Sequence, residues 1–221
     1  MTVLWWVLIN YLSFALLALL GAIVWFHSWW AGILALYLLP PLLARLTVLV
    51  GGTPGRRESV PSKGSYVWWI TTQLQVVFMR LPFLEEFLRM VPGLYSAWLR
   101  LWGARVGSLV FWSPAVLVAD RPFVEIEDRA VLGYGCKVTA HLLQQGRGGE
   151  AFSLMFAIPK IGRGAVLGTM SGMGPGSTVE AGATLAATTA LPPFHRVAGT
   201  DTYNPQGNVV PPIFILSHEE S

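Results

Sequence analysis

His141 is the residue of this chain best placed to do acid–base chemistry. An imidazole exchanges its proton near neutral pH, which suits a general base. His141 ends the run Val138-Thr139-Ala140-His141 and lies just before a glycine-containing segment, residues 144–159. By contrast, His195 lies in a proline-rich turn, where we expect a structural role, and His218 lies in the C-terminal tail.

A period of six residues places this histidine in a repeat. Every sixth residue from position 161 is apolar: Ile161, Leu167, Met173, Val179, Leu185, Leu191 and Val197. Small residues come two positions before most of them: Ala165, Ser171, Ser177, Ala183 and Thr189. This pattern predicts a hexapeptide-repeat parallel β-helix, with the apolar residue inside and the small residue at a tight corner. The glycines that follow the apolar residues, Gly162, Gly168 and Gly174, are expected to supply the corner's backbone freedom.

Two further registers extend the β-helix toward the N-terminus. One runs Ile126, Leu132, Val138, and the other runs Val106, Trp112, Val118, Val124, with a two-residue slip between them. Val138 and Ile161 are 23 positions apart, which is not a multiple of six. We therefore expect residues 144–159 to form a loop ejected from the solenoid, and such loops commonly mark a binding face.

The first 26 residues predict a membrane-spanning helix. Residues 3–26 are almost wholly apolar, and about 20 such residues cross a bilayer core. Trp5 at one end and Trp25 and Trp29 at the other would lie about 30 Å apart, at the two interfacial belts. A cleaved signal peptide needs a basic start and a shorter apolar run, so we reject that alternative.

A second apolar run, residues 31–50, is interrupted by Pro40-Pro41. It fits either a kinked second span or a re-entrant helical hairpin, and we favour the span. Basic residues then appear together: Arg45, Arg56, Arg57 and Lys63. By the positive-inside rule that side is cytoplasmic, so we expect an inner-membrane protein with its β-helix on the cytoplasmic side.

The stretch between the apolar runs and the repeat has two parts. Residues 51–64 are rich in Gly, Pro and Ser and predict a loop. Residues 65–103 alternate apolar runs with charges and predict two or three amphipathic helices around Pro82 and Pro92. We expect these helices at the membrane–water interface, and a packed soluble helical pair is the alternative.

Composition narrows the class of protein. Apolar residues make up 53% and charged residues 12% of 221 residues, and the first 44 residues hold no Asp, Glu, Lys or Arg. The single cysteine, Cys136, excludes an internal disulfide and occupies a small-residue corner slot, so we expect it to be structural. Basic patches interleaved with aromatic residues are absent, which argues against nucleic-acid binding.

Residues 100–205 resemble the left-handed β-helix acyltransferases with bacterial hexapeptide repeats, of the maltose and colanic acid O-acetyltransferase kind. Three segments carry the resemblance: the entry run Leu99-Arg100-Leu101-Trp102-Gly103, the run that ends at His141, and the terminating Leu191-Pro192-Pro193 with Val197-Ala198-Gly199 and Asn204-Pro205. The resemblance implies acyl transfer from acetyl-CoA or another acyl-CoA to a hydroxyl or amine, with O-acetyl transfer favoured, at a site between the subunits of a homotrimer. His141 would be the general base, with no metal.

The same resemblance suggests where the acyl-CoA would bind. The corner at Ser171 and Gly172 suits a groove that holds pantetheine through backbone amides, and Lys160 and Arg163 could meet the CoA phosphates. Solvated corner residues are the alternative for these two cations. The γ-class carbonic anhydrases share the architecture but need three zinc-binding histidines, and this β-helix contains two.

The polar surroundings of His141 depart from the family pattern. Leu142, Leu143, Gln144 and Gln145 follow it, and no acidic partner is evident before Glu150. Glu125, Glu127 or Asp128 could come close to it in space.

The sequence thus predicts a mainly β protein in five parts. These are a transmembrane hairpin (1–50), a loop (51–64), amphipathic interfacial helices (65–103), a hexapeptide-repeat β-helix (104–205) and a tail (206–221). We expect a membrane-anchored acyltransferase that acts on a membrane-proximal or saccharide acceptor. The alternative is a non-catalytic trimeric scaffold that packs against other subunits of a membrane complex.

Overall fold

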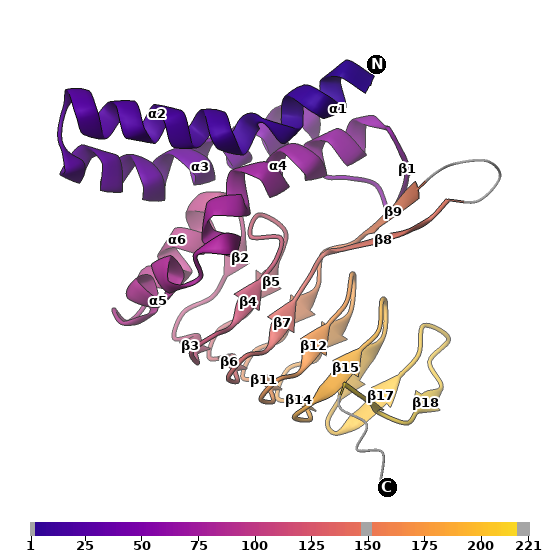
Figure 1. The fold of residues 1–221 in the computed structure, drawn as a ribbon. Coiled ribbons are helices and arrows are strands. Elements are labelled where there is room, and N and C mark those ends of the chain that lie inside the picture. The colour runs from indigo at the N-terminus through magenta and orange to yellow at the C-terminus, as the bar shows by residue number, and fades with distance from the viewer. Residues whose placement is uncertain (1–2, 147–151, 216–221) are drawn as a thin grey trace, which may run out of the picture.

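A computed structural model describes residues 3–146 and 152–215, with a helical N-terminal half above a parallel β-helix (Figure 1). The helices are α1 (Val3–Asn10), α2 (Leu12–Phe26), α3 (Trp29–Gly51), α4 (Lys63–Arg80), α5 (Phe83–Arg89) and α6 (Leu94–Trp102). One strand, β1 (Arg57–Val60), lies between α3 and α4.

The β-helix has three faces, each a stack of short parallel strands. The first face contains β2 (Arg105–Val106), β5 (Glu125–Ile126), β10 (Lys160–Ile161), β13 (Thr178–Val179) and β16 (Arg196–Ala198). The second contains β3 (Phe111–Trp112), β6 (Val131–Leu132), β11 (Val166–Leu167) and β14 (Thr184–Leu185). The third contains β4 (Leu117–Val118), β7 (Lys137–Val138), β12 (Gly172–Met173) and β15 (Thr189–Leu191). The predicted β-helix is confirmed.

Antiparallel strands finish the C-terminal end of the stack. β17 (Asp201–Tyr203) pairs with β16, β18 (Val209–Val210) pairs with β17, and β19 (Ile213–Phe214) pairs with β15. The predicted tail, residues 206–221, therefore includes two strands within its described part.

The sixth-position residues form the interior of the β-helix, as predicted. All seven from Ile161 to Val197 are at most 3% exposed, as are Ile126, Leu132 and Val138. The small residues, from Ala165 to Thr189, are equally buried. A small, mostly apolar interior of this kind stabilises each coil only when its neighbours stack on both sides.

The glycines after the apolar residues have a different role from the one expected. Gly162 and Gly168 do not have positive φ; instead, a Cβ at Gly168 would lie 2.4 Å from the Ala187 nitrogen, in the next coil. A Cβ at Gly162 would likewise lie 2.5 Å from the Ala181 nitrogen. These positions need glycine because the backbones of adjacent coils approach each other closely there.

The positive φ angles occur two residues later along each corner. Gly164 has φ 64°, and Met170, in the equivalent place of the next corner, has φ 56°. Residues with side chains therefore tolerate this left-handed corner position, at a cost of about 1–2 kcal/mol each.

Two insertions leave the regular coil, and both leave it at the same corner. Lys160 pairs with Thr178 and Thr178 with Arg196, each 18 residues on. Arg105 pairs with Glu125, which lies 20 residues further on, so this coil holds 2 extra residues (20 − 18). Glu125 pairs with Lys160, which lies 35 residues further on, so the next coil holds 17 extra residues (35 − 18). Each insertion follows a third-face strand and precedes a first-face strand, at what we call the third corner.

The longer insertion is a β-arm rather than the expected loop. β8 (His141–Gln145) and β9 (Phe152–Phe156) pair antiparallel, and β1 pairs with β9 from the other side. The predicted loop at residues 51–64 therefore contains a strand, because its residues 57–60 complete the edge of this arm (Figure 1).

The apolar N-terminal segments form a helical hairpin. The expected single helix over residues 3–26 is interrupted at Tyr11, which separates α1 from α2, and α3 continues through Pro40-Pro41. Within the described residues, α3 is the one helix long and apolar enough to cross a membrane. A core helix or a signal sequence would satisfy the same criterion.

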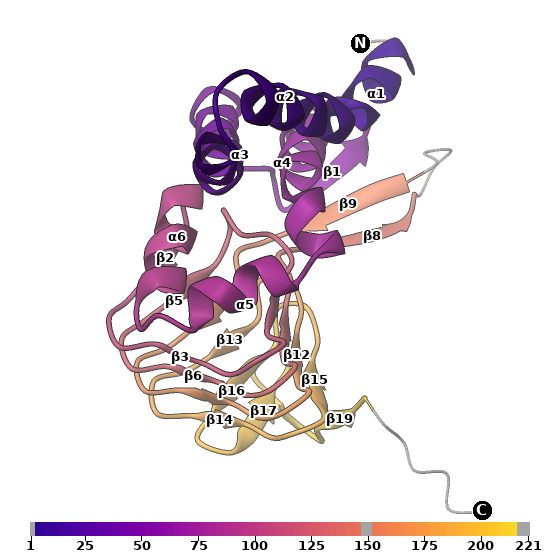
Figure 2. The ribbon, with the colours of Figure 1, turned by 60° about the vertical axis from the view of Figure 1, so that its left-hand side comes forward.

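Helices α4 and α6 cover the first coil and close its apolar interior. α6 buries Trp98, Leu99 and Trp102, which share one continuous core with the inside of the β-helix. Ten residues of α4 are buried between the hairpin and the β-helix (Figure 2). α4 is therefore a packed helix, and among α4 to α6 it is α5 that presents an exposed apolar side, at Phe83 and Phe87.

Replacing a glycine by alanine should reduce the stability of the β-helix more where two coils approach closely, as at Gly168, than where the glycine only has a positive φ, as at Gly164. Gly168→Ala places a methyl group against the backbone of the next coil and should destabilise the β-helix by about 3 kcal/mol or more. Gly164→Ala meets nothing within 4 Å and should cost only about 1 kcal/mol, from its φ of 64°. Thermal unfolding followed by circular dichroism compares the two variants; equal losses would contradict the assignment.

Candidate active site at the third corner

The two insertions bring a carboxylate and an imidazole together. Asp120 comes from the two-residue insertion before β5, and His141 opens the arm. The His141 Nδ1 atom lies 2.7 Å from Asp120 Oδ2 and 2.8 Å from Oδ1. The sequence predicts the histidine as the base but does not reveal this partner.

The strand register explains why these two residues meet. Val118 at the end of β4 pairs with Val138 at the end of β7, on neighbouring coils. Asp120 follows its strand by two residues and His141 follows its own by three, so both side chains leave at the same point of the stack. The two-residue slip in the repeat was the signal that could have located Asp120, because an insertion must leave the coil at a corner.

Asp120 is held as a buried hydrogen-bond acceptor. Its Oδ2 accepts hydrogen bonds from the Ala140 backbone nitrogen at 2.8 Å and from Thr139 Oγ1 at 3.1 Å. The Asp120 side chain is 2% exposed, whereas that of His141 is 26% exposed. The imidazole therefore reaches the surface while its partner stays inside, which is the arrangement that a proton-transfer pair requires.

The carboxylate determines which imidazole nitrogen holds the proton. An ionised carboxylate only accepts hydrogen bonds, so His141 Nδ1 must carry the donated hydrogen. In the neutral ring Nε2 is then unprotonated and can take a proton from a bound acceptor group. Asp120 also stabilises the imidazolium that forms when it does so.

The helical half contributes a wall to this site. The Trp68 ring of α4 lies 4.8 Å from the His141 ring, centroid to centroid. Trp68 is 5% exposed, and its indole nitrogen has no hydrogen-bond acceptor among the described residues. The indole ring therefore packs beside the imidazole as part of the protein interior.

A buried ion cluster fixes the corner that carries Asp120. Its neighbour Arg121 is fully buried; Nε donates to Glu85 Oε1 at 2.6 Å, and the backbone nitrogen donates to Gln75 Oε1 at 2.8 Å. Arg89 donates to Glu85 Oε2 at 2.8 Å, and so does the Tyr95 hydroxyl. Burial, together with the Glu85 carboxylate, raises the pKa of Tyr95, so its hydroxyl remains a donor.

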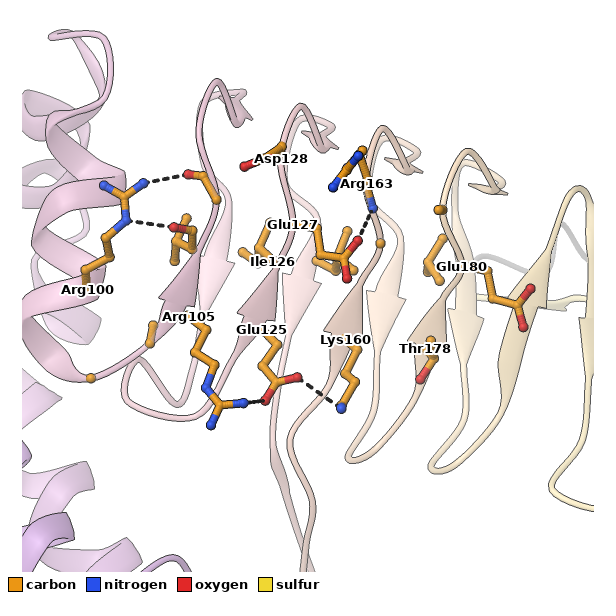
Figure 3. A pocket seen from close by; sticks show the side chains of 18 of the residues that line it. Arg100, Arg105, Glu125, Ile126, Glu127, Asp128, Lys160, Arg163, Thr178 and Glu180 are labelled. Atoms are coloured by element: carbon orange, nitrogen blue, oxygen red, sulfur yellow. Dashed lines mark hydrogen bonds and ion pairs between the residues drawn. The ribbon is translucent and has the colours of Figure 1, made fainter.

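The four predicted acyl-CoA contacts lie at two separate places. Lys160 and Arg163 lie on and just after β10, on the outer side of the first face, where a shallow depression runs across β2, β5, β10 and β13 (Figure 3). Lys160 forms an ion pair with Glu125 at 3.0 Å, and the Arg163 side chain is exposed. By contrast, Ser171 is fully buried inside the coil, and Gly172 lies on the third face beside Ile215.

The three acidic residues that could have come close to His141 make other contacts. Glu125 lies between Arg105 and Lys160 and forms an ion pair with each (Figure 3). Glu127 accepts from the Arg163 backbone nitrogen, and Asp128 accepts from the Ser108 backbone nitrogen. Glu127 and Asp128 lie in the turn that follows β5, and Glu125 is the first residue of β5.

The other histidine of the β-helix, His195, and its cysteine, Cys136, make contacts within the protein that indicate structural roles. The His195 Nδ1 atom lies 3.0 Å from the Pro193 carbonyl oxygen, two coils beyond His141 at the third corner. Cys136 is fully buried, and desolvation raises the pKa of its thiol to about 12. No group of three His, Cys, Asp or Glu side chains among the described residues could hold a metal ion.

The solved structures that this chain resembles in fold include several acetyltransferases. A hexapeptide-repeat acetyltransferase of Vibrio cholerae has 13% identity and a TM-score of 0.36, covering 64% of this chain and 94% of its own. A maltose O-acetyltransferase of Clostridium difficile has 10% identity and a TM-score of 0.27, covering 61% and 85%. A serine acetyltransferase of Entamoeba histolytica has 16% identity and a TM-score of 0.23, covering 86% and 71%.

No protein-family profile matches the chain, and no curated protein matches it. Similarity at this level concerns the fold alone. The fold and the repeat define a hexapeptide-type β-helix protein with a helical N-terminal half, and its chemistry is inferred below from its own residues.

The buried ion cluster predicts a large loss of stability on removing one charge. Glu85→Gln leaves the buried Arg89 and Arg121 without their shared carboxylate, which should cost about 3–5 kcal/mol in the free energy of unfolding. Glu180→Gln, which breaks an exposed pair with Arg196, should cost at most about 1 kcal/mol. Urea unfolding in detergent measures both, and similar losses would contradict a structural role for the cluster.

Proposed function

We propose that this protein is a membrane-attached acyltransferase that moves an acyl group from acyl-CoA to a hydroxyl group, with His141 as general base and Asp120 as its partner. The observation that supports this most directly is the pair itself, a buried carboxylate 2.7 Å from the Nδ1 atom of a partly exposed imidazole. The scaffold alternative was favoured by weak polar surroundings at His141. The contacts of Asp120 remove that reason.

The proposed reaction uses only the acceptor hydroxyl, the acyl-CoA thioester, His141 and Asp120. His141 Nε2 removes the proton of the acceptor hydroxyl as its oxygen attacks the thioester carbonyl carbon. The new C–O bond forms, the C–S bond breaks, and the imidazolium returns the proton to the leaving thiolate. The products are an ester and free CoA, and Asp120 stabilises the charge on the imidazole between the two steps.

The proposed donor is acetyl-CoA or another acyl-CoA, bound with its phosphates near Lys160 and Arg163. Both cations lie along the depression on the first face, and β10 begins directly after the arm that His141 opens. Cationic side chains at that edge suit phosphate groups. Ser171 points into the coil, so we assign no ligand contact to its side chain.

We propose further that the protein forms a homotrimer at the inner membrane, with its β-helix on the cytoplasmic side. The clustering of Arg45, Arg56, Arg57 and Lys63 after the apolar hairpin supports that sidedness. An acceptor held in or near the membrane would meet the site at raised effective concentration. Light scattering of the detergent-solubilised protein would measure the mass against three times 24.2 kDa.

The first functional prediction concerns the Asp120–His141 pair. His141→Ala should lower the rate of CoA release from acetyl-CoA by about 10²–10⁴-fold, and Asp120→Asn should lower it by a comparable factor, because the amide no longer fixes the tautomer. A thiol reagent measures the released CoA, and the buried Cys136 thiol, with its pKa of about 12, should not react with it.

His195→Ala serves as the matched control, because it removes a histidine at the same corner two coils away. It should retain the wild-type rate. The proposal fails if the wild-type protein releases no CoA with any hydroxyl acceptor, or if His141→Ala behaves as the wild type does. Either outcome would favour the non-catalytic scaffold.

The second functional prediction concerns the phosphates of the donor. The double variant Lys160→Ala/Arg163→Ala should raise the KM for acetyl-CoA about 10-fold, with kcat unchanged. An acetyl thioester of pantetheine, which lacks the nucleotide phosphates, should show no such change. Arg196→Ala, on β16 of the same face, is the control; an equal loss with both donors would contradict the phosphate contact.

A further inference from the structure

The inner side of the helical hairpin is tied to the rest of the protein by hydrogen bonds. At the start of α2, Ser13 Oγ donates to Gln73 Oε1 of α4 at 2.9 Å, in a buried position. Just before it, Asn10 Oδ1 accepts from Trp69 Nε1 at 3.1 Å. The N-terminal part of α2 is therefore packed against protein, where polar groups are satisfied by α4.

Similar contacts occur along α3. The Tyr37 hydroxyl donates to the Leu84 carbonyl oxygen at 2.8 Å, and the Tyr37 carbonyl oxygen accepts from Trp98 Nε1 at 2.9 Å. Eight residues further on, Arg45 Nη1 donates to the Arg100 carbonyl oxygen at 3.4 Å. One side of the second half of α3 is therefore packed against protein, whereas Leu46 and Leu49 on its other side are more than half exposed.

The free part of each helix, by which we mean the part beyond these hydrogen bonds, is too short to cross a bilayer by itself. On α2 the free part is residues 14–26, about 20 Å at 1.5 Å per residue, and on α3 it is residues 29–36, about 12 Å. The hydrocarbon core is about 30 Å thick, so one leaflet of it is about 15 Å. A hairpin that crossed would have to draw α4 and α6, with their buried polar groups, into the lipid.

The outward surface of the free part of the hairpin carries no charged side chain. The chain has no charged residue before Arg45. The turn between α2 and α3 presents aromatic rings: Trp25 is 84% exposed and Phe26 78%, and the Trp29 and Trp30 rings stack at 3.7 Å. Large exposed aromatic side chains on an uncharged helical turn favour lipid over water.

Helix α5 continues this apolar surface beside the hairpin. Phe83, Phe87, Met90 and Val91 are each more than half exposed, whereas Glu85 on the opposite side is buried in the ion cluster. In Figures 1 and 2, α5 and the hairpin turn project from the same side of the β-helix. The contact between Tyr37 and Leu84 places the start of α5 at the base of the hairpin's free part.

We propose that the hairpin enters a single leaflet without crossing the bilayer, with the exposed side of α5 resting at the headgroup boundary of the same surface. The occupant of this apolar surface is lipid, and the β-helix and both ends of the hairpin lie on one side. This arrangement replaces the expected second span by the re-entrant hairpin. It deepens the membrane attachment of the proposed function and is independent of acyl transfer.

A cysteine at the hairpin turn distinguishes one-leaflet entry from crossing. His27→Cys, in a Cys136→Ala background, is reconstituted into sealed phosphatidylcholine/phosphatidylglycerol vesicles and treated with a membrane-impermeant maleimide from either side. We expect no labelling in intact vesicles and full labelling in detergent. Thr200→Cys, exposed on the β-helix, is the control and should label from its own side alone.

The other outcomes overturn the proposal. Labelling of His27→Cys from the side opposite Thr200→Cys would show that the hairpin crosses the bilayer. Labelling from the same side as Thr200→Cys would show that the turn lies in water. Neither readout requires acyl transfer, so the proposed function can fail while this inference holds.

A depth measurement tests what covers the turn and α5. An environment-sensitive fluorophore on His27→Cys should be quenched most by lipids brominated deep in the acyl chain, and one on Met90→Cys by lipids brominated near the headgroup. Protection of His27→Cys from maleimide without quenching would mean that partner helices cover the turn. Absence of quenching at Met90→Cys would show that the end of α5 does not lie at the membrane surface. Each of these two results would contradict the proposal.

Discussion

The backbones of adjacent coils stack so closely that no extra residue fits within a strand of the β-helix. Where coils approach, as at Gly168, even a Cβ would contact the next backbone. Inserted residues must therefore leave at corners, and both insertions leave at the third corner. One supplies Asp120 and the other supplies His141, so the constraint that keeps the solenoid regular also brings the candidate catalytic pair together.

The helical half is a structural part of the candidate site rather than a separate anchor. Arg121, next to Asp120, is buried against Glu85 of α5 and Gln75 of α4, and Trp68 packs beside the imidazole. A buried guanidinium is tolerated only where its charge is matched and its donors are satisfied. The position of the helices over the first coil and the position of the carboxylate are therefore coupled.

Sequence reasoning failed where contacts between distant segments decide the structure. Residues 57–60 contain nothing that distinguishes a strand from a loop; they form β1 because β9 offers an edge. The alternation of charge with apolar residues suggested surface helices for residues 65–103, yet α4 is buried because the hairpin and the β-helix cover opposite sides of it. The Asp120 partner was missed because its spacing from His141 has meaning only once the coils are in register.

The sequence alone determined the β-helix, its interior residues, the corner residues and the histidine beside the insertion. Those features follow from a local period of six, which each coil repeats with the same backbone geometry. Tertiary structure alone decided the partner of His141, the ion cluster that holds its corner, and the length of hairpin left free for lipid. The Asp120–His141 pair joins residues 21 positions apart, and the Tyr37–Trp98 contact joins residues 61 positions apart. A period of six does not by itself state which of such distant residues meet.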